Sequence, residues 1–313
     1  MTLARISETC YKITKSYLNL TNRTSIITET QNAINLTRHI LINDVFTRWS
    51  PLNGEISFSY NGGKDCQVLL LLYLSCLWEF FVVKANESQF DFKYHRFPMT
   101  QLPTVFINSE ETWPTLENFM NYTQKRYHLS LYESMKDDDR YNKSMSMSDA
   151  FQDFLYKNPV TKAIVIGIRH TDPFGEHLKS IQKTDSNWPD FIRLQPLLHW
   201  KLGNIWSFLL FSNEPICGLY NYGFTSIGNV HETKPNPFLK IENSSNDIEL
   251  PFSREISNSF NPEMRNDNNI VNFSEIDGTD KEWLLQYSGN YLPGWYLTDD
   301  SLERAGRFKK PKA

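Results

Sequence analysis

The chain has 313 residues, of which 40% are hydrophobic and 14% aromatic, and its formal net charge is −4 at pH 7. This length and apolar content suffice for one large α/β domain or two smaller ones with a full hydrophobic core. The slightly acidic balance, with an isoelectric point near 6.0, argues against a general nucleic-acid binder and against a protein that lies on acidic membranes.

The cysteine pattern and the N-terminus indicate a cytoplasmic protein. The four cysteines are Cys10, Cys66, Cys76 and Cys217, with no CxxC pair and no zinc-finger spacing. Reduced thiols are therefore expected. The N-terminus has no continuous apolar run of the secretory kind. The most apolar segment, residues 68–83, is interrupted by Ser75 and Glu79, which predicts a buried helix and no membrane partner.

The apolar pattern predicts an alternation of helices and strands. In chain order, the predicted elements are a helix at 25–48, a strand at 55–60, a helix at 68–83, a strand at 102–108, a helix from Pro114, a helix with Ser148 as its N-cap, a strand at 162–168 and a helix near 201–213. Apolar strands that alternate with helices are typical of an α/β fold with a mostly parallel sheet flanked by helices.

The chain is predicted to form two domains. Residues 1–234 would form an α/β nucleotide-binding domain, and residues 235–313 a C-terminal subdomain that packs over the sheet edge. From about Pro235 to Glu275 the chain is dense in Asn, Ser and Pro, which indicates a surface excursion.

The stretch "SYNGGKDC", residues 59–66, lies between a predicted strand and a predicted helix. Glycines at such a turn let backbone N–H groups converge on a phosphate. The stretch is not a Walker A loop, because Asp65 rather than Ser or Thr follows Lys64, and it is not a GxGxxG loop. The alternative is a turn that only packs the helix on the strand.

This turn resembles the pyrophosphate-binding loop of the adenine-nucleotide α-hydrolase-like superfamily, which has a Rossmann-like fold. The closest shape is the phosphoadenylyl-sulphate reductase-like family, and within it the chain is similar to the fungal-type FAD synthases. The resemblance covers most of the chain in this order: "SFSYNGGKDCQVLL", "LPTVFI", "ETWPTLENF", "AIVIGIRHTDPFGE", "TDSNWPDFIRLQPLLHW", "SNEPICGLY", "GFTSIG" and "YLPGWYLTDDSLERAGR".

The resemblance implies an FMN adenylyltransferase, which transfers AMP from ATP to the terminal phosphate of FMN and gives FAD and pyrophosphate. Mg²⁺ is the expected cofactor, small molecules are the only expected partners, and a monomer is the expected state, although the sequence itself does not reveal the oligomeric state. The phosphate of FMN is already mostly dianionic at pH 7 because its second pKa is near ~6, so no general base is needed. Catalysis is expected to be alignment and charge neutralisation.

The resemblance also assigns the phosphate site. The implied phosphate-loop residues are Ser59, Asn61, Gly62, Gly63 and Asp65. Asp65 is either the Mg²⁺ ligand or a helix N-terminal residue favoured by the dipole, and Lys64 either neutralises phosphate or points to solvent. Asn61 and Asp65 are counted as catalytic together with Arg304 and Arg307. These arginines are three residues apart on one side of a helical turn and would neutralise phosphates; a solvated basic tail is the alternative.

Three further segments are expected to bind the ring systems. By the resemblance, Ile107 forms the adenine wall, or is a core residue, while Gly167 and Ile168 offer backbone to the adenine edge. Asp172 is a site carboxylate, or only begins an Asp-Pro turn. The implied flavin residues are Asp185, Ser186, Asn187, Trp188 and Arg193, with Trp188 either a ring wall or core. Nearby His170, Glu176 and His177 are expected at the surface.

Two other functions are alternatives. A sulphonucleotide reductase needs a C-terminal nucleophilic cysteine, whereas the last cysteine here is Cys217 and the chain ends in "LERAGRFKKPKA". A non-catalytic flavin nucleotide binding protein is disfavoured by the presence of Asn61, Asp65 and both arginines. FAD formation separates the three.

Overall fold

The structure is a computed structural model that describes residues 1–21, 24–83, 97–107, 111–134, 146–241, 251–252, 275–287 and 289–308. The chain divides into two compact units. The first comprises Met1–Asn61, Asp65–Ser109 and Tyr122–Trp200, and the second comprises Gly62–Lys64, Glu110–Asn121 and Lys201–Ala313. Residues 201–234, which we assigned to the nucleotide-binding domain, thus belong to the second unit, and a domain boundary at residue 235 stays a prediction.

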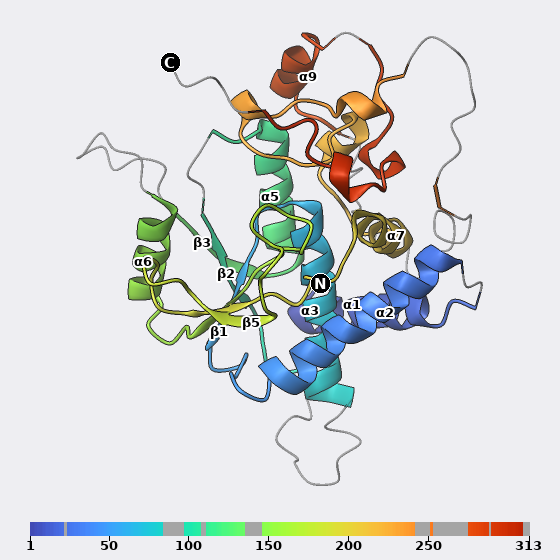
Figure 1. Cartoon of the computed structure of the whole chain (residues 1–313). Helices are drawn as coiled ribbons and strands as arrows, with labels where there is room; N and C mark the ends of the chain where they lie inside the picture. Colours follow the sequence, from blue (N-terminus) through green and yellow to red (C-terminus); the bar gives the residue numbers. More distant parts are fainter. Residues whose placement is uncertain are drawn as a thin grey trace. The chain divides into compact units, whose positions relative to one another are not determined.

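The first unit contains a sheet whose six described strands have the order β3-β2-β1-β4-β6-β5 (Figure 1). The strands are β1 (Ile56–Ser59), β2 (Leu102–Phe106), β3 (Leu129–Glu133), β4 (Ala163–Val165), β5 (Ile181–Lys183) and β6 (Ile192–Leu194). All neighbouring pairs are parallel except the edge pair of β5 with β6. The predicted mostly parallel α/β fold is therefore confirmed, and its C-terminal subdomain over the sheet edge stays a prediction.

The described helices follow the predicted order. They are α1 (Leu3–Leu18), α2 (Ser25–His39) with a π-helical continuation (Ile40–Val45), α3 (Lys64–Trp78) with a second one (Glu79–Val83), α5 (Pro114–Arg126), α6 (Met147–Lys157), α7 (Leu202–Ser212) and α9 (Gly278–Leu284). Helix α1, the strands β3, β5 and β6, and α9 were not predicted.

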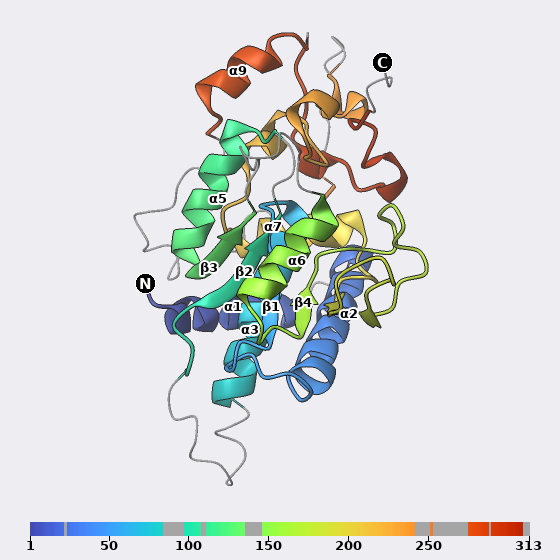
Figure 2. The same cartoon turned by 90° about the vertical axis from the view of Figure 1, so that its left-hand side faces the viewer.

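Helices cover both faces of the sheet in the first unit. Phe58 of β1 packs on Tyr73 of α3, with ring centroids 5.5 Å apart. Val105 and Ile164 align with the neighbours of Phe58 along β1, so they point to the opposite face. There they pack in one cluster with Phe154 of α6. Figure 2 shows α6 in front of the strands and α3 behind them.

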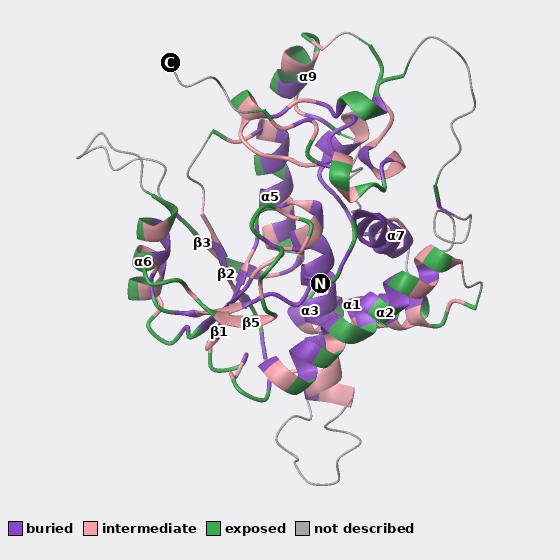
Figure 3. Ribbon diagram, in the orientation of Figure 1, coloured by how far each residue is buried: buried purple, intermediate pink, exposed green. Residues whose placement is uncertain are grey.

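Helix α3 is the central apolar element. An 18-residue window within Lys64–Val83 has a mean hydropathy of 2.0, which is enough to cross a bilayer, but 72% of that window is buried in the fold. The purple colour of α3 in Figure 3 shows this burial. The burial is that of a core helix, as the interrupted apolar run predicted.

Two local predictions were wrong. Helix α6 begins at Met147, and its N-cap is Ser146, whose hydroxyl accepts the N–H of Asp149 at 3.2 Å; Ser148 lies inside the first turn. Strand β4 spans only three residues, so Gly167 and Ile168 lie in the loop that follows it. Most of the Asn/Ser-rich excursion, residues 242–250 and 253–274, lies outside the described residues.

The second unit is built from α7 and a group of packed aromatic rings. All but one of the residues of α7 are buried. Trp113 makes edge-to-face contacts with Phe224 and Trp283, with ring centroids 5.2 and 4.5 Å apart. Trp206 of α7 contacts Tyr220 in the same way at 5.2 Å. The unit thus has a core of its own.

Candidate active site

The strand order places the ends of β1 and β4 side by side at the carboxyl edge of the sheet. From β1 the chain passes through β2 to β3, and it then returns to β4 on the other side of β1. Ligands of open α/β sheets bind at such switch points. Ser59 ends β1, exposed Asn61 follows it, and Asp65 lies in the first turn of α3. The chain beyond β4 carries the loop from Gly167 to Asp172.

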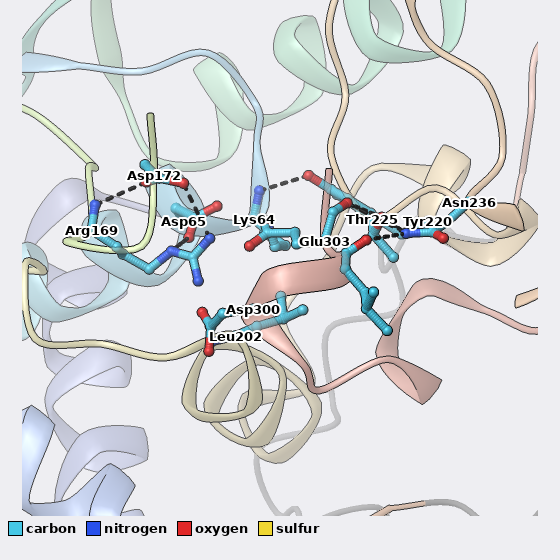
Figure 4. A network of polar contacts seen from close by, with 11 residues as sticks. Lys64, Asp65, Arg169, Asp172, Leu202, Tyr220, Thr225, Asn236, Asp300 and Glu303 are labelled. Carbon is cyan, nitrogen blue, oxygen red and sulfur yellow. Dashed lines mark hydrogen bonds and ion pairs between the residues drawn. The ribbon is translucent and has the colours of Figure 1, made fainter. Parts of the chain in front are cut away.

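A buried arginine joins the two sides of this edge. The side chain of Arg169 is 0% exposed, with Nε 2.7 Å from Asp65 Oδ1 and Nη2 3.3 Å from Asp172 Oδ1 (Figure 4). A guanidinium stays charged and is costly to bury, so the two carboxylates stabilise it by neutralising it. Arg169 was not among the site residues predicted from the sequence. The available signal was its position directly after a predicted strand and three residues before Asp172.

Asp172 also closes the loop in which it lies. It accepts the backbone N–H of Arg169 at 2.9 Å, and its own carbonyl accepts the N–H of Gly175 at 2.9 Å. A Cβ at Gly175 would lie 2.1 Å from the Arg169 carbonyl oxygen, so only glycine fits. The turn reading of Asp172 is therefore confirmed, while its role as a substrate-binding carboxylate stays a prediction.

Of the three residues of this loop that were expected at the surface, Glu176 and His177 are exposed, whereas His170 is half-buried. The side chains of Glu176 and His177 are 84% and 91% exposed, which confirms their surface position. His170 is half-buried, and its Nδ1 lies 2.9 Å from the carbonyl oxygen of Gly175. His170 thus helps to close the loop.

Gly167 lies against the start of α3. A Cβ at this position would lie 3.1 Å from Cys66 Sγ and 3.2 Å from the Cys66 backbone nitrogen. Burial, followed by the charge of Asp65, raises the pKa of the Cys66 thiol to about 12. Burial likewise raises the pKa of Cys217 to about 12. Both thiols are therefore protonated at neutral pH and are poor nucleophiles.

Ile107 and Trp188 pack against one hydrophobic cluster. The buried members of this cluster are Val105, Phe151, Phe154, Ile164 and Phe191. Trp188 lies 6.0 Å from Phe151 between ring centroids. Ile107 and Trp188 are both only half-buried. Their core packing is thus present, and their role as walls for the two ring systems stays a prediction.

The segment from Asp185 to Arg193 presents a carboxylate at the surface. The Asp185 side chain is 62% exposed and lies 3.3 Å from Nη2 of Arg193, while its carbonyl accepts the N–H of Trp188 at 2.9 Å. Ser186 and Asn187 are exposed in the same turn. Arg193 also donates to the carbonyl of Lys183 at 3.1 Å. Arg193, in β6, therefore fixes the position of the Asp185 carboxylate. Flavin binding by residues 185–193 stays a prediction.

In the second unit, residues Gly62–Lys64 form a turn, called the glycine turn below, that is fixed by close packing. Gly62 has φ +71°, and a Cβ there would lie 2.7 Å from Leu116 Cδ1 and 3.0 Å from Met120 Sδ, so this position requires glycine. The backbone N–H of Lys64 donates to the Tyr220 hydroxyl at 2.9 Å. The Lys64 side chain is only 3% exposed and forms an ion pair with Glu303. The prediction that Lys64 points to solvent is therefore wrong.

The arginine-bearing segment is anchored within the second unit. The N–H of Arg307 donates to the carbonyl of Arg304 at 2.8 Å, so the two arginines lie in a tight turn rather than a helix. Arg307 forms an isolated bridge with Thr233. A Cβ at Gly306 would lie 2.4 Å from the Lys234 carbonyl oxygen. Arg304 is exposed and Arg307 half-buried. A free, solvated tail is therefore excluded for Arg307.

The carboxylates beside the predicted phosphate loop, residues 59–65, suit a metal ion most of whose coordinating atoms come from a bound nucleotide and water. The described residues contain no group of three or more His, Cys, Asp or Glu side chains placed to hold a metal ion. Mg²⁺ commonly takes one or two carboxylates and completes its shell with phosphate oxygens and water. Asp65 and Asp172, with side chains 18% and 22% exposed, are both oriented by Arg169. A metal brought in by a nucleotide fits this donor set.

Comparison with known proteins gives matches along the whole chain. Residues 55–235 match the family model of the phosphoadenosine phosphosulfate reductase domain. A flavin adenine dinucleotide synthase of Saccharomyces cerevisiae is 61% identical over 310 residues, which cover 99% of this chain and 100% of that protein.

Two solved structures are similar over nearly the same length. The FMN adenylyltransferase of Candida glabrata in complex with FAD and inorganic pyrophosphate has a TM-score of 0.87 and 56% identity, and covers 99% of each chain. The same enzyme in complex with FMN and the ATP analogue AMPCPP has a TM-score of 0.87 and 55% identity, again over 99% of each chain. The resemblance seen in the sequence motifs therefore extends to the whole fold.

Proposed function

The chain belongs to the phosphoadenosine phosphosulfate reductase domain family and, within it, to the FAD synthases, and from this membership we infer that it is an FMN adenylyltransferase. The enzyme transfers AMP from ATP to the terminal phosphate of FMN and releases FAD and pyrophosphate. The observation that carries this inference is the similarity over 99% of the chain to a FAD synthase and to an adenylyltransferase solved with both substrate-side and product-side ligands.

The reaction needs two anions to be brought together. An oxygen of the FMN phosphate attacks the α-phosphorus of ATP, the bond to the β-phosphate oxygen breaks, and pyrophosphate leaves with the electron pair. Because the nucleophile is already ionised, the protein contributes alignment and charge neutralisation. Asn61, Gly62 and Gly63 would bind the triphosphate at the N-terminus of α3, where the helix dipole favours negative charge.

The charged side chains divide into two roles. Arg304 and Arg307 lie in an anchored turn and would neutralise phosphate oxygens directly. Arg169 is fully buried between two carboxylates, so it orients Asp65 and Asp172 rather than binding phosphate. Asp185, held by Arg193, would accept a hydrogen bond from the imide edge of the isoalloxazine, with Trp188 beside the ring. Ser59, Ile107, Gly167 and Ile168 would line the adenosine part, and Ser186 and Asn187 the flavin part.

Mg²⁺ is proposed as the cofactor. When bound with the triphosphate, the metal would supply positive charge that neutralises phosphate oxygens. Asp65 is the carboxylate of the phosphate loop that would hold it. This assignment is supported by the partial exposure of Asp65 and by the affinity of Mg²⁺ for carboxylate oxygen combined with phosphate.

The test is product formation by the purified full chain. ATP with Mg²⁺ and FMN should give FAD and pyrophosphate in equal amounts over many turnovers, as measured by chromatography and a coupled pyrophosphate assay. Omission of Mg²⁺ should abolish both products. If neither FAD nor pyrophosphate forms, the inference is wrong. One equivalent of flavin nucleotide retained without turnover would instead identify a binding protein.

A sulphonucleotide reductase is the second enzyme class to be tested. Cys217, the last cysteine of the sequence, is a poor candidate for the nucleophilic thiol of such an enzyme, because it is buried and burial raises its pKa to about 12. Phosphoadenylyl sulphate supplied with a dithiol reductant should therefore give no sulphite. Sulphite release would overturn the adenylyltransferase assignment.

We propose that the enzyme acts in the cytoplasm as a monomer, without nucleic-acid or membrane partners. The supporting observations are the net charge of −4 and four buried cysteines in no disulfide, as expected in a reducing compartment. Sedimentation equilibrium and imaging of the tagged full chain would check the two points separately.

A further inference from the structure

Lys64 occupies an unusual environment for a lysine of a phosphate-binding turn. Its side chain is 3% exposed, and its ammonium group forms an ion pair with the carboxylate of Glu303, which is 6% exposed. The partners are separated by 239 positions in the sequence, and both belong to the second unit. The ion pair therefore connects the glycine turn to the residue that directly precedes Arg304.

The backbone on both sides of this ion pair is held in place. The N–H of Lys64 donates to the hydroxyl of Tyr220 at 2.9 Å. On the other side, the carbonyl of Glu303 accepts the hydroxyl of Thr225 at 2.5 Å and the amide of Asn236 at 3.4 Å. Figure 4 shows these residues converging around Lys64 and Glu303. The ion pair is thus a fixed connection between two anchored segments.

The residues that precede Arg304 are anchored as well. The carboxylate of Asp300 accepts the N–H of Leu202 at 2.9 Å, at the beginning of α7. The amide of Asn236 also donates to the carbonyl of Leu302 at 2.9 Å. The ion pair is therefore not needed merely to keep the segment attached to the unit.

Stability alone does not account for a buried ion pair. Both charges lose hydration on burial, and apolar residues of similar size are often as stable or more stable at such sites. What a buried ion pair does supply is a defined distance between two segments. In catalysis by alignment, a displacement of about 1 Å costs on the order of 10²-fold in rate.

We propose that Lys64 and Glu303 are positioning residues of adenylyl transfer: their ion pair sets the place of the Arg304–Arg307 segment relative to the glycine turn. The proposal rests on the proposed function and assigns Lys64 a role other than direct phosphate binding. The two roles differ in what Lys64 requires. A positioning lysine depends on Glu303, whereas a phosphate-binding lysine does not.

A double-mutant cycle tests the proposal with Lys64→Met, Glu303→Leu and the double variant. Each single variant leaves one buried charge without its partner, so the segment shifts, and kcat should fall by about 10²-fold while KM for ATP changes by less than about threefold. The double variant leaves no such charge. Its kcat should exceed that of either single variant by at least about tenfold.

The controls separate folding, function and positioning. Lys12→Met and Glu8→Leu disrupt an exposed ion pair of α1 and should leave kcat and KM unchanged. Circular dichroism and thermal melting establish that each variant is folded at the assay temperature. If the single variants do not fold, the double variant alone tests the proposal. Its kcat is then expected to lie within about tenfold of the wild-type value.

Three results would overturn the proposal. The first is a Glu303→Leu variant with wild-type kcat, which would mean that the ion pair sets nothing. The second is a double variant no more active than Lys64→Met, and the third is a raised KM for ATP in every variant that lacks Lys64; both would assign Lys64 to phosphate binding. An inactive wild-type chain is a different outcome, because it contradicts the proposed function itself.

Discussion

At the scale of single residues, the two most informative sites are Lys64 and Arg169, whose charged side chains are buried against partners that lie elsewhere in the sequence. Lys64 is buried because Glu303, 239 positions away, meets it. Arg169 is buried because Asp65 and Asp172 flank it. The types of these residues are visible in the sequence, but their partners depend on the tertiary fold. The glycine turn could thus be predicted from the sequence, whereas the partners that bury Lys64 and Arg169 could not.

Gly228 offers a test of the role of Arg307. A Cβ at Gly228 would lie 2.2 Å from three atoms of the Arg307 guanidinium. In Gly228→Ala the flexible arginine side chain must move, while the backbone need not. We expect stability within about 1 kcal/mol of wild type and a loss of FAD formation of about tenfold or more, since Arg307 no longer aligns the phosphate.

The matched control is Gly278→Ala in the same unit. Nothing lies within 4 Å of a Cβ built at Gly278, which is the first residue of α9. Activity and stability should both stay at the wild-type level or improve slightly. Equal activity of the two variants in steady-state assays would argue against a catalytic role of Arg307.

At the scale of elements, the order and type of most helices and strands followed from apolar periodicity. The exceptions are the long helix α1, which was not predicted, and several short elements and one cap. Strands β5 and β6 have three residues each, too few for a period-2 pattern to be recognised. Ser146 and Ser148 both lie at the beginning of α6, and by residue type either one satisfies the N-cap preference; the geometry selects Ser146. Short elements and cap positions are therefore decided by packing rather than by composition.

The cap assignment has a direct stability test. Ser146→Ala should lower the free energy of unfolding by about 1 kcal/mol, because the N–H of Asp149 loses its acceptor. Ser148→Ala should change it by less than about 0.5 kcal/mol, since this residue lies in the first turn. Urea unfolding of both variants measures the difference. The reverse order of effects would restore Ser148 as the cap.

Helix α5 begins with a cap supplied from another element, and this cap makes stability depend on pH. The carboxylate of Asp280 in α9 accepts the N–H of Thr115 at 2.7 Å, and burial raises the pKa of Asp280. As the pH rises above about 4, an unfolded aspartate loses its proton first. Ionisation therefore favours unfolding between the unfolded-state and folded-state pKa values.

The Asp280→Asn variant keeps the acceptor and removes the charge. Its stability relative to wild type should grow as the pH rises from about 4 and should level off above the folded-state pKa of Asp280. Urea unfolding of both proteins at a series of pH values gives this difference. A constant difference, or one that shrinks with rising pH, contradicts the raised pKa.

At the scale of the whole molecule, the two compact units divide the proposed work. The first unit carries the Asp65–Arg169–Asp172 cluster, and the second unit carries the glycine turn and the arginine segment. This division could not be predicted from the sequence, because the second unit combines three separate segments of the chain.

The burial of the cysteines across both units predicts their reactivity. Cys10, Cys66, Cys76 and Cys217 are all buried, and burial raises the pKa of Cys66 and of Cys217 to about 12. A thiol reagent at pH 8 should label none of the four in the native protein and all four in denaturant. FAD formation should survive the native treatment. Fast labelling of a native cysteine with loss of activity would contradict this account.

The central claim is that AMP moves directly from ATP to the phosphate of FMN, and label transfer tests it most directly. ATP labelled at the α-phosphorus should place its label in FAD and none in pyrophosphate when incubated with the full chain, FMN and Mg²⁺. The transfer should fall by at least about 10²-fold in Arg307→Ala. Consumption of ATP without labelled FAD, or label that appears only in free AMP, would contradict the claim.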